Sequence, residues 1–548
     1  MLEQALAALK ANDLASAEVL LLKALSSQTD RHGALRLLVR LYVSQNKLQQ
    51  AIEFTEQLLA DHPDNQDYYV SLAQFYQLEF QEQKLLQLWQ QFVSKWPTEQ
   101  KGWFNLVLSA RRSRNAEVAL TALARWFELT GDNGEFLFQQ ALVYSELLRQ
   151  ERKAMELLQQ LLVLQPGHHG ALFNLGHLSE QLGELTEATS YFYAACQSHP
   201  DDATSWARWL ELAKLDKQQL QQHRVQLEAL LSAPLNTSQI DLYYAFGLSY
   251  DRLGLYNEAW HCYQKANQGD SQFLPQYQPE RTKQLIADCL RRDSAVWPKS
   301  QASALIPILI CGMFRSGSTL AEQIIAASEQ VACGGELEFL HRQLFPLIQQ
   351  PEALVAKASE SDFTAGYLEQ IERLLQGRRY FTDKRPENFL YLDAVFYNFP
   401  AAKVIWTRRQ LADNALSVYF HRLGPGMNYA ANLDAILHYE QQQRQLMHHW
   451  QQRYPGQIFE LDYDELVSQP TSVLQALFAF LGLHYNGEAE RFYQLKHAVK
   501  TASVSQVRRP LYQQSSGRFR NYQADILQSG RFPAYCQLIS SLAADRKE

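Results

Sequence analysis

The chain has 548 residues, of which 46% are hydrophobic and 20% charged, and this composition is typical of a globular protein with two or more domains. Its formal net charge of −7 argues against general nucleic-acid binding but permits a local basic pocket. The six cysteines are widely spaced and form no CxxC pair, so we expect reduced thiols, no metal site and a cytoplasmic location.

The N-terminal stretch MLEQALAALK lacks the basic start and apolar core of a secretory signal. No apolar run in the chain is long enough to cross a bilayer. We therefore expect neither a cleaved leader nor a membrane-spanning segment.

Residues 1–295 are predicted to be helical almost throughout, with a repeating period. A small or apolar residue opens an apolar helical run at steps of 34, 34, 34, 35 and 34 residues, at Ala17, Ala51, Leu85, Ala119, Ala154 and Ala188. Turn residues recur in phase at Pro63, Pro97, Gly131, Pro166 and Pro200. Twelve positions before an anchor lies another small residue, such as Gly176 or, later, Gly247 before Ala259. The pattern predicts stacked helical hairpins whose helices approach closely at the small residues.

This period resembles the tetratricopeptide repeat, a 34-residue helix–turn–helix unit. The resemblance implies a superhelix with a groove that binds a peptide, a protein segment or a second subunit, which leaves a homodimer open. The alternative is that the array only scaffolds the domain that follows it.

The pattern changes near residue 295. Strand-like runs at 305–311, 403–407 and 457–462 alternate with helical stretches, which favours a parallel sheet covered by helices. We therefore predict an α-helical repeat superhelix over residues 1–295, followed by an α/β domain with a phosphate-binding loop over residues 296–548.

The first of these strands runs into a loop typical of phosphate binding, Gly312-x4-Gly317-Ser318-Thr319. Glycine lets the backbone approach an anion, and the amides at a helix N-terminus point towards it. Ser318 stands where nucleoside triphosphatases have lysine, so the loop fits a triphosphate poorly. A nucleotide with a single phosphate at this position fits better.

Five segments in order make a chance match improbable: FRSGSTL (314–320), TDKRPENF (382–389), VIWTRRQLADNALSVYF (404–420), FELDYDELV (459–467) and TASVSQVRRPLYQQSSGRFRNY (501–522). Together they resemble sulfotransferases that use 3′-phosphoadenosine 5′-phosphosulfate (PAPS). Within that group the chain looks closest to bacterial tetratricopeptide-repeat sulfotransferases and to tyrosylprotein sulfotransferase. The resemblance covers roughly residues 305–525 and implies that PAPS is the co-substrate and that no metal is needed.

The resemblance implies a cofactor site made by several separate segments. The loop would bind the 5′-phosphate, and an arginine with a serine eight residues later would bind the 3′-phosphate. A tyrosine would pack near the adenine, and an arginine nearer the C-terminus would also contact the phosphates. The corresponding residues here are Ser316, Gly317, Ser318, Thr319, Leu320, Arg409, Ser417, Tyr463 and Arg518. The usual Arg-Asp-Pro of the 3′-phosphate loop reads Arg409-Gln410-Leu411, which makes this loop less rigid.

The resemblance also implies four catalytic residues. Arg315 would stabilise charge on the transferring group, and Glu336 would be the general base, with Glu338 as its rival. Lys384 would support the leaving group, a role that Arg385 could also fill, and Ser503 would bond the phosphosulfate. The predicted reaction is transfer of a sulfuryl group from PAPS to a hydroxyl, with tyrosine in a peptide as the first candidate acceptor and a carbohydrate, lipid or small molecule left open. The alternatives are a nucleotide kinase or NTPase with a phosphate-binding loop, and a non-catalytic repeat scaffold.

Overall fold

The computed structural model describes residues 1–27, 29–292, 297, 304–349, 363–369, 371–485, 487–495, 507–513 and 515–544. The chain divides into two compact units, Met1–Asn174 and Leu175–Glu548. The change from repeat helices to sheet lies further along, between Arg291 and Ile306.

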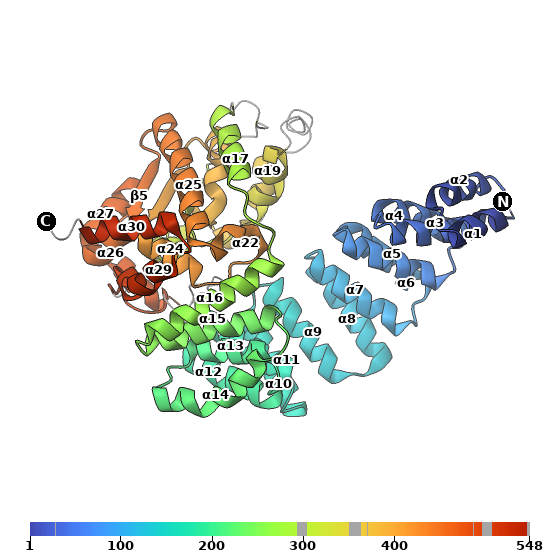
Figure 1. The fold of residues 1–548 in the computed structure, drawn as a ribbon, viewed down its shortest axis with the longest axis horizontal. Coiled ribbons are helices and arrows are strands. Elements are labelled where there is room, and N and C mark those ends of the chain that lie inside the picture. Colours follow the sequence, from blue (N-terminus) through green and yellow to red (C-terminus); the bar gives the residue numbers. More distant parts are fainter. Residues whose placement is uncertain are drawn as a thin grey trace. The chain divides into compact units, whose positions relative to one another are not determined.

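The first part of the chain is a series of helical hairpins, which Figure 1 colours from blue to green. Its helices are α1 (Leu2–Lys10), α2 (Leu14–Ala24), α3 (Arg31–Ser44), α4 (Leu48–Asp61), α5 (Gln66–Leu78), α6 (Glu82–Lys95), α7 (Gln100–Arg112), α8 (Ala116–Thr130), α9 (Asn133–Glu146), α10 (Glu151–Leu164), α11 (His169–Gln181), α12 (Leu185–Ser198), α13 (Ala203–Leu212), α14 (Lys217–Leu231), α15 (Thr237–Arg252), α16 (Tyr256–Phe273) and α17 (Pro279–Arg291). The predicted repeat architecture is confirmed.

The small residues that set the period lie where paired helices touch. The alanine anchors at 17, 51, 119, 154, 188 and 259 are completely buried. A Cβ added at Gly176 would lie 2.7 Å from the ring of Phe192, and one added at Gly247 would lie 2.6 Å from the ring of Tyr263. Both pairs are sixteen residues apart, so the same contact recurs in two repeats.

We expect Gly247→Ala to lower the melting temperature, although alanine is the better helix former by about 1 kcal/mol. The ring of Tyr263 stacks on that of Phe420 at 3.8 Å and cannot retreat, so overpacking should cost about 1–3 kcal/mol. Differential scanning calorimetry measures the change. Gly426→Ala, where an added Cβ meets nothing within 4 Å, is the control, and equal melting temperatures for the two variants would contradict the packing argument.

A five-stranded parallel sheet forms the centre of the second part, with strands in the order β2-β3-β1-β4-β5. The strands are β1 (Ile306–Gly312), β2 (Val331–Ala332), β3 (Tyr380–Lys384), β4 (Lys403–Arg408) and β5 (Ile458–Asp462). The chain moves from β1 to one side of the sheet and later returns to place β4 on the other side. Ligands of such folds bind at the carboxyl ends of the strands where the order reverses, which here are β1 and β4.

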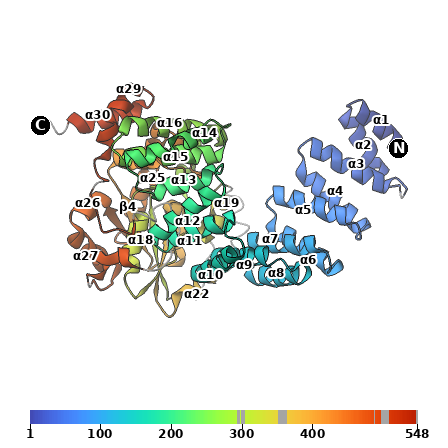
Figure 2. The same cartoon turned by 90° about the horizontal axis from the view of Figure 1, so that it is seen from below.

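Helices and short 3₁₀ turns surround the sheet. They are α18 (Ser318–Ala326), α19 (Phe339–Gln349), α21 (Phe363–Glu369), α22 (Glu372–Leu375), η2 (Pro386–Tyr391), α23 (Leu392–Asn398), α24 (Leu411–Tyr419), η3 (Pro425–Ala431), α25 (Leu433–Arg453), α26 (Tyr463–Ser468), α27 (Pro470–Leu481), η4 (Glu488–Gln494), η5 (Arg518–Tyr522), α29 (Gln523–Ser529) and α30 (Pro533–Ala544). Figure 2 shows α26 and α27 next to each other.

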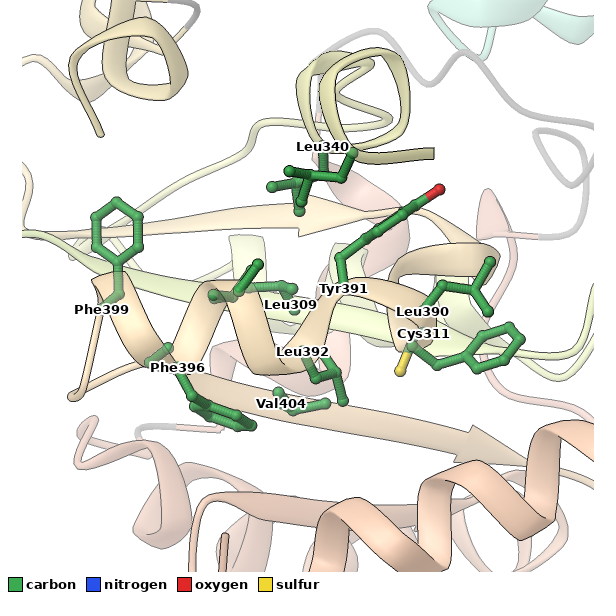
Figure 3. Close-up of a cluster of buried hydrophobic side chains, with 14 of the residues drawn as sticks. Leu309, Cys311, Leu340, Leu390, Tyr391, Leu392, Phe396, Phe399 and Val404 are labelled. Carbon is green, nitrogen blue, oxygen red and sulfur yellow. The ribbon is translucent and has the colours of Figure 1, made fainter. Parts of the chain in front are cut away.

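Strand β1 is buried along its whole length because both faces of the sheet are covered. Leu309 and Cys311 pack on one face with Val404 and with residues of η2 and α23, as Figure 3 shows. Ile308 and Ile310 point to the other face, against α18 and α27. This double burial explains the continuous apolar run that predicted the strand.

The last repeat hairpin shares a hydrophobic core with the sheet domain. Trp260 and Tyr263 of α16 pack with Tyr419 and Phe420 at the end of α24. The side-chain amide of Asn267 donates to the backbone carbonyl of Tyr419 at 2.9 Å. This common core places the final repeats in the same compact unit as the sheet.

Candidate active site

The loop after β1 is fixed to the neighbouring strand β4. Gly312 has φ +152°, and a Cβ added there would lie 2.4 Å from both the carbonyl and the hydroxyl oxygen of Thr407. The Ser316 hydroxyl donates to the Met313 carbonyl at 2.6 Å and is hydrogen-bonded to the Thr407 hydroxyl at 2.7 Å. Only glycine fits at position 312. The Ser316 side chain holds the loop against Thr407 of β4.

A cavity of about 690 Å³, its mouth included, lies at the start of α18. It is lined by eight of the nine predicted cofactor residues, all except Ser316, and by Arg315, Phe492, Val507, Arg509, Pro510, Leu511, Tyr512 and Ser515. The structure therefore brings the loop after β1, the segment after β4, the start of α26 and the C-terminal arginine around one space.

Four arginines line this cavity and make it strongly basic: Arg315, Arg409, Arg509 and Arg518. Burial, together with the nearby charges of Arg409 and Arg518, lowers the pKa of Arg315 to about 10. The side chain is still protonated at neutral pH. Its Nε lies 3.4 Å from the Ser417 hydroxyl, and its backbone has φ +65°, a left-handed conformation that costs about 1–3 kcal/mol. Several cations crowded around one strained loop residue are typical of a site that binds an anion.

Arg409 is held by a ring and a carbonyl. Its guanidinium carbon lies 5.0 Å from the centre of the Tyr463 ring, and its Nη2 donates to the carbonyl of Ser515. The neighbouring Arg408 points elsewhere and pairs with Glu460 on β5. Of the two arginines, only Arg409 lines the basic cavity.

Arg518 lies in a loop that Asp413 anchors. The carboxylate of Asp413, in α24, accepts hydrogen bonds from the backbone amides of Gly517 and Phe519 on either side of the arginine. The Arg518 guanidinium is paired with Asp251 at 2.8 Å and lies 5.1 Å from the ring centre of Phe420. Burial alone would lower the pKa of Arg518, but the charge of Asp251 raises it, so this group is a permanent cation.

Glu336 and Lys384 form a separate pair at the end of β3. The Lys384 ammonium donates to the Glu336 carboxylate, and the lysine is 1% exposed while the glutamate is 41% exposed. Lys384 is in register with Ile310 of β1, two residues before Gly312. Neither residue lines the cavity, so the pair lies one strand away from it.

A buried carboxylate that the sequence did not single out supports the Glu336 segment. Glu322 of α18 accepts hydrogen bonds from the amide of Gly335 at 3.0 Å and from the hydroxyl of Thr382 at 2.8 Å. Burial raises the pKa of Glu322. A charged residue within the largely apolar segment STLAEQIIA was the available signal. The predicted residue Ser503 and its neighbour Gln506 lie outside the described residues.

A second, more open cavity of about 1270 Å³, mouth included, lies against the repeat helices α12 to α15. Tyr193, Trp209 and His223 contribute rings, with ring centres 5.2 Å apart for the first two and 4.9 Å apart for the last two. Arg252 and Arg509 are also among its lining residues. Arg509 lines both cavities, so we call this second space the adjoining groove.

Within the described ranges, no group of three or more His, Cys, Asp or Glu side chains is arranged to hold a metal ion. No helix in those ranges combines the length and the apolar character of a bilayer-spanning segment.

Comparison with known proteins assigns the two parts of the chain. Residues 307–487 match the sulfotransferase family, and residues 8–74, 148–203 and 240–268 match tetratricopeptide repeats. An uncharacterized protein of Aquifex aeolicus (strain VF5) is 29% identical over an alignment of 433 residues, and the match covers 73% of this chain and 56% of the relative. The chain therefore matches little more than half the length of that relative.

Solved structures similar to parts of the chain include both kinds of domain. The sulfotransferase domain from the curacin biosynthetic pathway is 16% identical with a TM-score of 0.32, and covers 40% of this chain and 92% of its own. The sulfotransferase domain from the Synechococcus PCC 7002 olefin synthase is 20% identical with a TM-score of 0.32, and covers 41% and 90%. A tetratricopeptide repeat protein from Parabacteroides merdae ATCC 43184 is 16% identical with a TM-score of 0.32, and covers 43% and 91%.

The sulfotransferase match supports sulfuryl transfer as the general type of reaction. The repeats are of a kind that makes contacts with proteins. This chain therefore carries a sulfotransferase-family domain at residues 307–487, preceded by tetratricopeptide repeats.

Proposed function

We propose that the protein transfers a sulfuryl group from PAPS to an acceptor hydroxyl. The observation that carries this proposal is the cavity in which Arg315, Arg409 and Arg518 converge on a phosphate-binding loop without lysine. Two separated acidic groups on one nucleoside would satisfy such a cluster, since arginine binds phosphate in a bidentate way.

The residues would divide the nucleotide between them. The loop residues Gly317 to Leu320 would hold the 5′-phosphate at the N-terminus of α18, where backbone amides and the helix dipole favour an anion. Arg409, Ser417 and Arg518 would hold the 3′-phosphate, and Tyr463 would pack near the adenine. Ser316 would act by bracing the loop.

The reaction forms one bond to sulfur and breaks another. The acceptor oxygen attacks sulfur, and the bond from sulfur to the bridging oxygen of the 5′-phosphate breaks, which leaves a sulfate ester and adenosine 3′,5′-bisphosphate. Glu336 would take the proton of the acceptor, Arg315 would stabilise the transferring group, and Lys384 would stabilise the leaving oxygen. The hydrogen bond between Lys384 and Glu336 keeps these two groups next to each other. Ser503 remains a predicted ligand of the phosphosulfate.

The acceptor we propose first is a tyrosine in a peptide or protein, by analogy with tyrosylprotein sulfotransferase. The adjoining groove supports delivery of an acceptor by the repeats, because it shares Arg509 with the basic cavity. A cytoplasmic location is likewise a proposal, supported by six free cysteines. A homodimer remains a prediction that light scattering would test.

The donor is tested by ligand binding to the full chain. Adenosine 3′,5′-bisphosphate should raise the melting temperature, because a ligand of the folded state stabilises it. ATP with Mg²⁺ should give a much smaller shift, since Ser318 replaces the lysine that would reach its outer phosphates. Transfer of label from ³⁵S-PAPS to tyrosine peptides then tests the acceptor. A larger shift with ATP and Mg²⁺ would favour a kinase or NTPase, and no shift with either nucleotide would favour a scaffold.

A further inference from the structure

A carboxylate of the repeat array reaches the proposed nucleotide site. Asp251, in the last turn of α15, pairs with Arg518 at 2.8 Å, and the Arg518 Nε lies 3.3 Å from the same carboxylate. Asp251 also accepts a hydrogen bond from the hydroxyl of Tyr522. Asp251 and Arg518 are 267 residues apart in the chain. The side chain of Asp251 is only 15% exposed.

Asp251, Arg518 and Tyr522 are all described by the structure, and of these three only Arg518 lines the basic cavity. Asp413 fixes its backbone through the flanking amides, whereas Asp251 fixes the guanidinium itself. A guanidinium has five N–H groups in a rigid plane, so two of them can hold a carboxylate while others face a ligand. The orientation of that plane decides whether the remaining groups point at a phosphate.

We propose that Asp251 is a positioning residue that orients Arg518 for the phosphate of the nucleotide, so that the last tetratricopeptide hairpin completes the donor site. This inference rests on the proposed function, because it takes the nucleotide to occupy the basic cavity. The repeats thereby contribute to binding of the donor as well as to any contact with the acceptor.

A second ion pair between the repeats and the sheet domain provides a matched control. Asp241, also in α15, pairs with Arg422 at 3.2 Å, and Arg422 pairs in addition with Asp270 at 2.9 Å. Neither Asp241 nor Arg422 lines the basic cavity. Substitution of Asp241 therefore removes an ion pair between α15 and the sheet domain without changing a residue that lines the basic cavity.

The experiment measures binding of adenosine 3′,5′-bisphosphate to the full chain by isothermal titration calorimetry. We expect Asp251→Asn to weaken binding by about tenfold or more, the effect of misdirecting a charged hydrogen-bond donor. Asp241→Asn should bind as the wild type does. With Arg518→Gln already present, Asp251→Asn should have no further effect on the dissociation constant, since it would act only through that arginine. In turnover assays Asp251→Asn should raise the KM for PAPS and leave kcat unchanged.

The outcomes separate the two proposals. If the wild type does not bind the bisphosphate, the proposed function fails. If the wild type binds and Asp251→Asn binds equally well or more tightly, the positioning role is wrong while the donor assignment stands. Additive effects of Asp251→Asn and Arg518→Gln would also overturn the positioning role, because they would show that Asp251 acts independently of Arg518.

Discussion

Arg315→Ala should lose sulfuryl transfer by a factor of about 100 to 1000, the usual effect of removing a donor that stabilises charge in the transition state. Arg315 lies on the loop after β1, its Nε is 3.4 Å from the Ser417 hydroxyl, and it shares the cavity with three other arginines. The same substitution should leave the melting temperature unchanged or raise it. Burial and the charges of Arg409 and Arg518 lower the pKa of Arg315, so the folded state disfavours its positive charge.

The two measurements are initial rates with ³⁵S-PAPS and melting by calorimetry. Arg408→Ala is the control, because Arg408 pairs with Glu460 and does not line the cavity. It should retain the rate of the wild type. Equal rates for Arg315→Ala and the wild type would remove Arg315 from the mechanism, and a large fall in melting temperature would mean that its charge is structurally favourable.

Gly312→Ala should destabilise the sheet domain and abolish nucleotide binding. An added Cβ would lie 2.4 Å from the backbone carbonyl of Thr407, and a backbone atom of a central strand cannot move aside. A forced shift of β1 against β4 should cost about 2–4 kcal/mol and would displace the loop that holds the phosphate.

Gly482→Ala is the matched control for this clash. Gly482 also has positive φ, at +69°, but an added Cβ there meets nothing within 4 Å. The control therefore carries the cost of the left-handed backbone, about 1 kcal/mol, without the steric contact. Calorimetric melting and bisphosphate titration compare the two variants. Similar melting temperatures with intact binding in both would show that β1 and β4 can separate at Gly312.

Local patterns in the sequence were sufficient to predict much of the fold. The repeat period was readable because each hairpin needs its own small residue at the helix contact, as at Gly176 and Gly247. Strands β1, β4 and β5 were predicted to within a residue or two. The clearest of them was β1, because it is an uninterrupted apolar run. The loop at Gly312 was recognisable because phosphate binding needs glycine at a fixed spacing.

Other features depend on partners that are distant in the chain. Strand β2 has only two residues, and β3 ends in the buried charged residues Asp383 and Lys384, which mask its strand character. The Tyr367 hydroxyl donates a hydrogen bond to Asp383, and Lys384 donates one to Glu336, so both charged groups find their partners in other segments. The pairing of Arg518 with Asp251 could not be predicted from the sequence either, because no local pattern near one residue indicates the other as its partner. The convergence of the arginines was expected from the family resemblance, not from any local pattern.

The common core of the last hairpin and the sheet domain limits how such a protein can diversify. Early hairpins contact chiefly their neighbours, so units can be gained, lost or rewritten there at little structural cost. A replacement for α15 and α16 would have to reproduce the packing on Phe420, the amide contact of Asn267 and the carboxylate of Asp251 together. The N-terminal hairpins can therefore change without affecting the sheet domain, whereas α15 and α16 can change only together with it.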